Sequence, residues 1–398
     1  MIKIGETAGR RAIRPRHAPI GLIAIVLIGL LFAVSRRAQP PPAIIYTTVV
    51  GRIPSSQSGS LLVPTMALDT HTRQVFVTIA NDGTLTTLNV DTGAVVRTVA
   101  LSPDPVIPRT SLSLAEDVRT SHIFVADTGG NIEMLDARDG RLLRTIFVPA
   151  PAPLFLVEDA RHTRVFVVGR QGTTIVVFDI DARDDRLSHQ TSISPTDNTW
   201  ELTSAVLDPS AGHLSISTGD MGTGVVYVLN ESTHALVRTI RIGSPQRYPR
   251  VSAVDRSTGH LLLTTSPHDF LLLVNGRTGR IAGMAAVHSS PWALAVDARR
   301  GHTYAVGMCS CITMLETRTG ATLRTIQLDV RPSAIVVDET TGYVLVADPG
   351  GLEEVQTPDM LSWMPSAIRR LVPGLLAAQP AQSRIVPPTV TLLNPNAF

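Results

Sequence analysis

The 398-residue sequence is poor in cysteine, lysine and aromatic residues. Its two cysteines, Cys309 and Cys311, are too few for a disulfide-stapled scaffold or a cysteine-rich zinc module. The motifs of nucleophile-elbow hydrolases, P-loop nucleotide enzymes and zinc proteases are absent, so the sequence gives those classes no support. A hydrophobic content of 44% and a net charge of +2 are typical of a folded chain and exclude a disordered one.

Positive charge is concentrated at the N-terminus. Residues 1–37 carry seven basic side chains and one acidic one, Glu6, whereas residues 38–398 carry a net charge of −4. A mildly acidic body does not attract phosphate backbones over its whole surface. The charge distribution therefore disfavours nucleic-acid binding.

The N-terminal region has the features of a membrane anchor. Residues 18–35 form an uncharged apolar run, which as a helix would span about 27 Å, close to the thickness of a bilayer core. Five basic residues precede the run and two follow it, which predicts a cytoplasmic segment over 1–17 and export of the rest. Residues 36–43 form a proline-rich spacer. We expect a single-pass protein of the cell membrane. The alternative is secretion after signal cleavage near Ser35, which the length of the run disfavours.

The body of the chain is an internal repeat. Seven copies of an apolar strand ending in aspartate, a turn and a second apolar strand recur every 41–49 residues. Most copies continue into a third strand, a glycine-containing turn and a fourth strand, as in TLTTLNVDTGAVVRTVAL over 84–101. Four short strands at this period are typical of a β-propeller blade. The marker aspartates are Asp69, Asp117, Asp159, Asp208, Asp255, Asp297 and Asp338.

The count of strands predicts an all-β fold, a seven-bladed propeller over residues 44–398. Six blades are complete by Leu328, and the seventh has two strands at 333–347 and a third at 389–394. Its missing fourth strand matches the pattern of residues 44–53, IIYTTVVGRI. We therefore expect the N-terminal strand to close the last blade, which removes exposed sheet edges.

The repeats resemble a known family. The strand–Asp–turn–VFV pattern, followed by D-x-x-T-G-x-x-x-R-T-I, is similar to the YVTN-type repeats of YncE-like propellers, over about 63–350 and the two closing strands. The resemblance implies a secreted or surface-bound protein that binds a ligand or partner, without established catalysis. It stops at an insertion over residues 352–386.

Ligands of propellers usually bind at the central mouth, on the face opposite the Asp turns. Arginines and tryptophans in the segments that reach this face would suit an anionic or planar ligand, or a protein partner. The alternative is that these side chains are simply solvated. The candidate ligand-binding residues are Arg109, Trp200, Glu201, Arg250, His268, Trp292 and Arg331.

The insertion is the most individual segment. Within it, Trp363 precedes a short helix candidate that carries Arg369 and Arg370. Since it joins the second and third strands of blade seven, we expect it on the mouth face. It is either a docking element for a partner, with these three residues as contacts, or a helix packed onto the blade.

The sequence predicts no metal site, cofactor or catalytic residue. The marker aspartates should cap their own turns. Four histidines follow a marker aspartate by five residues, which places each in a different blade. They therefore cannot converge on one ion. We expect them to be exposed turn residues. Arginine replaces the tryptophan that quinone-cofactor propellers need. Cys309 and Cys311 are interpreted as small residues near a strand start rather than ligands for copper or zinc. The histidines are His122, His213, His260 and His302, and the arginines are Arg97, Arg144, Arg238 and Arg324.

Three functions remain open. The first is a membrane-anchored, extracytoplasmic binding scaffold, which turn-building repeats favour. The second is a lactonase or lyase whose site at the mouth would bring Glu201, Arg250 and His268 together. The third is single-stranded nucleic-acid binding, which needs a contiguous arginine patch.

Overall fold

The computed structural model describes only part of the chain, and all of that part lies in the compact unit Ala43–Phe398. The predicted segments 1–17 and 18–35 and residues 36–43 lie outside it. Within the described ranges, no helix is long and apolar enough to cross a membrane. The described residues are 44–50, 64–79, 83–101, 113–127, 129–150, 154–183, 186–194, 201–219, 224–242, 248–266, 270–287, 291–355 and 382–393.

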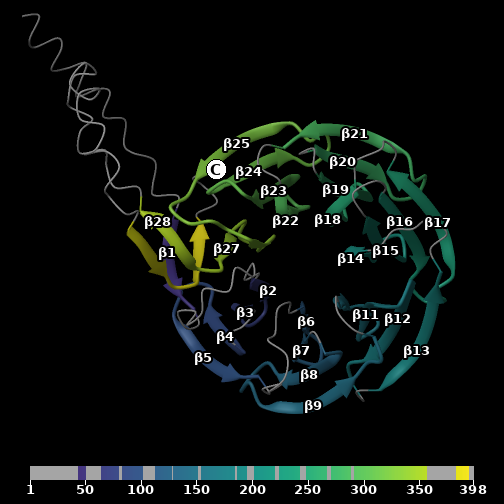
Figure 1. Cartoon of the computed structure of the whole chain (residues 1–398), viewed down its shortest axis with the longest axis horizontal. Coiled ribbons are helices and arrows are strands. Elements are labelled where there is room, and N and C mark those ends of the chain that lie inside the picture. The colour runs from purple at the N-terminus through teal and green to yellow at the C-terminus, as the bar shows by residue number, and fades with distance from the viewer. Residues whose placement is uncertain are drawn as a thin grey trace, which may run out of the picture. The chain divides into compact units, whose positions relative to one another are not determined.

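The described strands form seven four-stranded antiparallel sheets, arranged as blades around a central axis (Figure 1). Each of the first six blades uses four consecutive strands. Blade one is β2 (Pro64–Asp69), β3 (Gln74–Ile79), β4 (Thr84–Asn89) and β5 (Val95–Ala100). Blade two is β6 (Ser113–Asp117), β7 (His122–Ala126), β8 (Asn131–Asp136) and β9 (Leu142–Phe147). Blade three is β10 (Phe155–Asp159), β11 (Arg164–Gln171), β12 (Thr174–Asp181) and β13 (Leu187–Ile193).

The next three blades repeat this plan. Blade four is β14 (Glu201–Asp208), β15 (His213–Gly219), β16 (Gly224–Asn230) and β17 (Leu236–Ile242). Blade five is β18 (Tyr248–Asp255), β19 (His260–Ser266), β20 (Phe270–Asn275) and β21 (Ile281–Ala286). Blade six is β22 (Pro291–Asp297), β23 (His302–Gly307), β24 (Cys311–Glu316) and β25 (Thr322–Gln327).

Blade seven combines both ends of the propeller. Its order from the axis outward is β26 (Ala334–Val337), β27 (Val344–Asp348), β30 (Thr389–Leu393) and β1 (Ile44–Val49). Because β1 pairs antiparallel with β30, the predicted closure of the last blade by the N-terminal strand is confirmed. The closing strand also reaches blade one, since the Tyr46 hydroxyl donates to the Val90 carbonyl at 2.7 Å and Thr48 Oγ1 to the Gly93 carbonyl at 2.7 Å.

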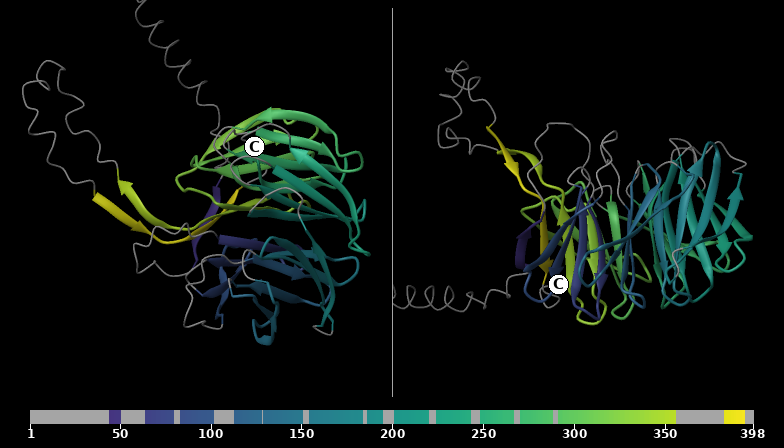
Figure 2. Two further views of the ribbon diagram at one scale, coloured as in Figure 1. Left: turned by 45° about the vertical axis from the view of Figure 1, so that its right-hand side comes forward. Right: turned by 90° about the horizontal axis from the view of Figure 1, so that it is seen from below.

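The predicted insertion starts and ends in a two-stranded sheet. Strand β28 (Gly351–Val355) pairs with β29 (Gln382–Val386), and Figure 2 shows this hairpin extending from blade seven. The candidate contacts Trp363, Arg369 and Arg370 lie outside the described residues.

The core lies between neighbouring blades. The second and third strands are buried almost throughout, as in Val75–Ile79 of β3, whereas the outermost strands alternate exposed and half-buried residues. Blades two and three share a cluster that contains Phe124 and Phe178, and blades seven and one share one that contains Leu88 and Leu392. Each sheet therefore depends on both neighbours for burial of its two faces.

The marker aspartates cap their turns, as predicted, in six of the seven described blades. In blade one, Asp69 Oδ1 accepts the backbone N–H groups of His71 at 2.7 Å and Thr72 at 3.1 Å. Comparable bonds form at Asp117, Asp208, Asp255, Asp297 and Asp338. Asp159 differs, because its Oδ1 has no hydrogen-bond partner in the structure described.

Arginines tie successive Asp turns together. Arg119 of blade two donates to the Arg161 carbonyl of blade three at 2.8 Å, and Arg300 of blade six donates to the Glu339 carbonyl of blade seven at 3.0 Å. Arg73 of blade one pairs with Asp338 of blade seven across the closure. Burial alone would raise the pKa of Asp338, but hydrogen bonds from Thr340, Thr341 and Arg73 hold it far below its usual range.

The four repeat-position histidines are not exposed turn residues. The residues His122, His213, His260 and His302 each begin a second strand and are half-buried. His122 Nδ1, for example, lies 2.8 Å from the Ala182 carbonyl of blade three. That expectation was wrong because it placed the residue in the turn rather than in the strand.

A substitution at Gly93 tests the contact between the closing strand β1 and blade one. Gly93 has φ +70°, and a Cβ atom there would lie 2.5 Å from the Tyr46 ring of the closing strand. We expect Gly93→Ala to lower the free energy of unfolding by about 2–4 kcal/mol, from backbone strain and the collision together. Urea unfolding measures the loss.

Gly83→Ala is the matched control, since Gly83 has φ +63° but nothing within 4 Å of its Cβ position. Its free energy of unfolding should fall only by the cost of the backbone strain, about 1–2 kcal/mol. The extra loss of stability in Gly93→Ala comes from the collision with Tyr46. Adding Tyr46→Ala to Gly93→Ala should therefore recover part of it. Equal losses at the two glycines would show that the Tyr46 contact is unimportant.

Candidate functional site

Four of the seven predicted mouth residues are described, and they come from four blades. Glu201 begins β14 and is exposed, Arg250 and Trp292 lie near the starts of β18 and β22, and Arg331 precedes β26. The Arg331 side chain is exposed, while its backbone N–H donates to Asp348 Oδ2 at 2.5 Å. Arg109, Trp200 and His268 lie outside the described residues.

The structure brings one predicted pair into contact. The Arg250 guanidinium carbon lies 5.9 Å from the centre of the Trp292 ring, and both side chains are half-buried. Trp292 Nε1 is buried and has no hydrogen-bond partner within the described ranges. Arg250 forms no ion pair with another described residue. The pair therefore presents N–H donors from two adjacent blades, with no ion-pair partner for Arg250 and no acceptor for Trp292 Nε1 among the described residues.

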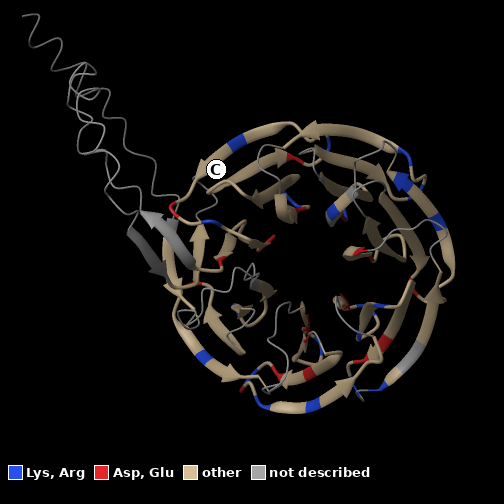
Figure 3. Ribbon diagram, viewed as in Figure 1, with Lys and Arg blue, Asp and Glu red and all other residues tan. Residues whose placement is uncertain are grey.

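A cavity of about 370 Å³ lies at the other end of the inner strands. It is lined by residues near the ends of β2, β6, β10, β14 and β18, with apolar walls from Leu68, Leu114 and Leu207. Three charged residues, Glu116, Glu158 and Arg256, share it. Figure 3 shows both acidic and basic positions around the central opening, and basic positions spread along the outermost strands.

The two glutamates differ in their pKa. Burial, followed by the charges of Asp69 and Glu158, raises the pKa of Glu116 to about 9. Burial and the charge of Asp117 raise the pKa of Glu158 to about 7, although the Val118 backbone and Arg256 oppose this. A hydrogen bond between the Glu116 and Asp69 side chains, which needs a proton on one of the two carboxyl groups, also raises the pKa of Glu116. The cavity therefore holds a neutral acid beside a group that titrates near neutral pH.

Sequence analysis missed this pair, although the repeat carries the signal. The residue before the marker aspartate is leucine or valine in five blades and packs against a cluster between blades. In blades two and three it is Glu116 and Glu158. Glutamate at an apolar position of a repeat indicates a special environment. The five apolar residues are Leu68, Leu207, Val254, Val296 and Val337.

A second polar cluster lies at the junction of blades three and four. Asp159, His162 and Glu231 each offer a ligand atom within 4.8 Å of the others. In the described part of the chain, none of the four repeat-position histidines joins such a group.

The two cysteines form a disulfide in the loop before β24, with their Cα atoms 5.1 Å apart. They are therefore paired rather than two separate small residues, and as a disulfide they offer no thiolate to a metal.

No protein-family profile matches this chain, and no curated protein matches it in sequence. Solved structures match its fold. The β-propeller domain of Cps50 (Swd1) from Myceliophteria thermophila is 12% identical, with a TM-score of 0.58, and the match covers 76% of this chain and 96% of that domain. A chain of the Mitotic Checkpoint Complex crystal structure is 13% identical, with a TM-score of 0.62, covering 87% and 95%. At these identities the likeness shows the β-propeller fold alone.

The cavity acids predict a pH dependence of stability. The pKa of Glu116 rises from 4.5 to about 9 on folding, so the folded protein keeps a proton that the unfolded chain releases. Its contribution to stability is full below about pH 4.5 and is lost as the pH rises towards about 9. We expect Glu116→Gln to flatten this decline and to raise the free energy of unfolding at pH 8. Urea unfolding between pH 5 and pH 9 measures the profile.

Glu158→Gln serves as the comparison, because the pKa of Glu158 reaches only about 7. Its effect should grow up to about pH 7 and then level off, whereas that of Glu116→Gln should continue to grow. Parallel profiles for the wild type and Glu116→Gln would contradict the buried, protonated state of this acid.

Proposed function

We propose that this chain is a binding propeller that receives an acidic group of a protein partner at its central mouth. The observation that carries the proposal is the contact between Arg250 and Trp292. A guanidinium held over an indole ring can still donate its N–H groups to a carboxylate. Trp292 Nε1 adds a donor that lacks an acceptor among the described residues, and Arg331 on the next blade is exposed. These groups favour an anion.

Two further observations support a partner rather than a catalytic reaction. Glu201 and Arg250 share no hydrogen bond or ion pair in the described structure, so the lactonase or lyase alternative gains no support from their geometry. The repeated arginines are distributed around the outer strands rather than in one patch, so nucleic-acid binding gains none either (Figure 3). The similar chain of the Mitotic Checkpoint Complex belongs to an assembly of proteins, as its name says.

The mouth is tested by binding of a fluorescent peptide rich in Asp and Glu, compared with its Asn and Gln counterpart. We expect only the acidic peptide to bind. Arg250→Ala should weaken its binding about tenfold, because a charge-assisted hydrogen bond is lost. Fluorescence polarisation measures the affinity.

The control is Arg318→Ala. Arg318 is an exposed arginine in the turn between β24 and β25, on the face opposite the mouth. This variant should bind like the wild type. Equal binding of the two peptides, or equal losses in both variants, would contradict an anion site at the mouth.

We further propose that residues 18–35 anchor the chain in the cell membrane, with the propeller outside. The uncharged run and its asymmetric basic flanks support this proposal, as does the resemblance to YncE-like propellers. We expect the full chain to sediment with membranes and to need detergent for release, whereas a chain that starts at residue 43 should remain soluble.

The mass of the mature N-terminus separates the anchor from its alternative. An intact N-terminus in the membrane fraction fits the anchor, and a chain that begins near Arg36 fits signal cleavage. An intact N-terminus in the soluble fraction would contradict both.

A further inference from the structure

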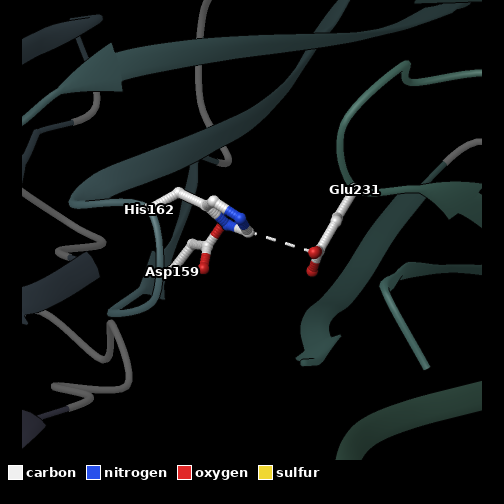
Figure 4. A group of neighbouring side chains, drawn as sticks. All are labelled: Asp159, His162 and Glu231. Atoms are coloured by element: carbon white, nitrogen blue, oxygen red, sulfur yellow. Dashed lines mark hydrogen bonds and ion pairs between the residues drawn. The ribbon is translucent and has the colours of Figure 1, made fainter. Parts of the chain in front are cut away.

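The junction of blades three and four holds an Asp, a His and a Glu whose side chains point toward one another (Figure 4). Asp159 ends β10, His162 lies in the turn that follows, and Glu231 follows β16 of the next blade. His162 Nδ1 is 2.8 Å from Asp159 Oδ2 and 4.0 Å from Glu231 Oε1. The three groups therefore need only small rotations to share one ion.

Asp159 lacks the Oδ1 hydrogen bond that the other marker aspartates share. In the other six blades, Oδ1 accepts a backbone N–H from its own turn. Asp159 is 0% exposed, yet its Oδ1 has no partner in the structure described. A buried carboxylate oxygen without a donor is costly unless a ligand satisfies it.

Glu231 is equally unusual for its position. The equivalent residue in the other blades with this turn is small or uncharged: Val90, Ala137, Ala182, Gly276 and Thr317, each donating its backbone N–H to the preceding turn in the same way. Glu231 is 8% exposed, and its Oε2 has no partner among the described residues. Glu231 thus brings a second buried carboxylate with an oxygen that lacks a donor, while its Oε1 lies 4.0 Å from His162 Nδ1.

The surroundings orient the aspartate. Arg164 donates Nε–H to Asp159 Oδ2 at 2.8 Å and contacts Asp179 Oδ2 at 3.2 Å. These bonds hold the Asp159 carboxylate in place, as outer partners of metal ligands commonly do. With the imidazole uncharged, the carboxylates of Asp159, Glu231 and Asp179 and the guanidinium of Arg164 leave a net charge of −2, which suits a divalent cation.

We propose that Asp159, His162 and Glu231 bind a divalent transition-metal ion of the zinc type and thereby link blades three and four. One imidazole and two carboxylates match the ligand preference of Zn²⁺ better than that of Mg²⁺ or Ca²⁺. The imidazole is half-exposed, which leaves a coordination position open to water. The site is independent of the proposed mouth, since it lies at the Asp-turn end of the inner strands.

The test is equilibrium dialysis of the full-length, oxidised chain against ZnCl₂, with bound zinc measured by mass spectrometry of the metal. We expect one zinc ion per chain, and a rise in the melting temperature on zinc addition. Glu231→Gln and His162→Gln should each weaken zinc binding at least about tenfold and remove the rise, because each loses a ligand.

His71→Gln is the matched control, since His71 is an exposed histidine in the corresponding turn of blade one. It should bind zinc like the wild type. Circular dichroism checks that the variants fold. If Glu231→Gln does not fold, His162→Gln still tests the site, because His162 is exposed. Absence of bound zinc in the wild type, or unchanged binding in His162→Gln, would overturn the proposal.

Discussion

The pairing of β1 with β30 is the constraint on which the propeller depends. Every blade buries its two faces against its neighbours, and Tyr46 and Val50 at the closing strand belong to the cluster shared with blade one, so an incomplete last blade would leave blade one partly uncovered. The chain supplies the last strand from its other end, about 340 residues away in sequence. Tyr46 and Thr48 then extend the closure into the glycine turn of blade one. One short strand thus completes a sheet and seals the ring.

Arginine side chains also join the Asp turns of neighbouring blades. They donate to turn carbonyls of the next blade, as Arg119 and Arg300 show. Blade three uses its aspartate differently, since Arg164 and His162 take up Asp159 and the neighbouring turn supplies Glu231. The other six marker aspartates share one hydrogen-bonding pattern. We infer that the junction of blades three and four, where this pattern changes, has an additional role.

The fold could be read from the sequence because its signal is repeated. The period, the marker aspartates and the pattern of 44–53 predict seven blades and their closure, and the strand bounds differ by only a few residues. The site could not be read in the same way. The contact of Arg250 with Trp292 joins two blades, and Glu231 approaches His162 across the junction of two blades. No spacing in the sequence therefore predicts either pair. Glu116 and Glu158 were visible as departures from the repeat, but their pKa values depend on burial that no single repeat reveals.

Amide hydrogen exchange of the closing strand tests this account most directly. If β1 is an integral strand of blade seven, the peptide that covers residues 44–49 should be as strongly protected as the peptide that covers its partner β30. Both should exchange only through global unfolding. Rapid exchange of 44–49 beside a protected β30 would mean that the ring stands without its N-terminal strand, which would contradict the central claim.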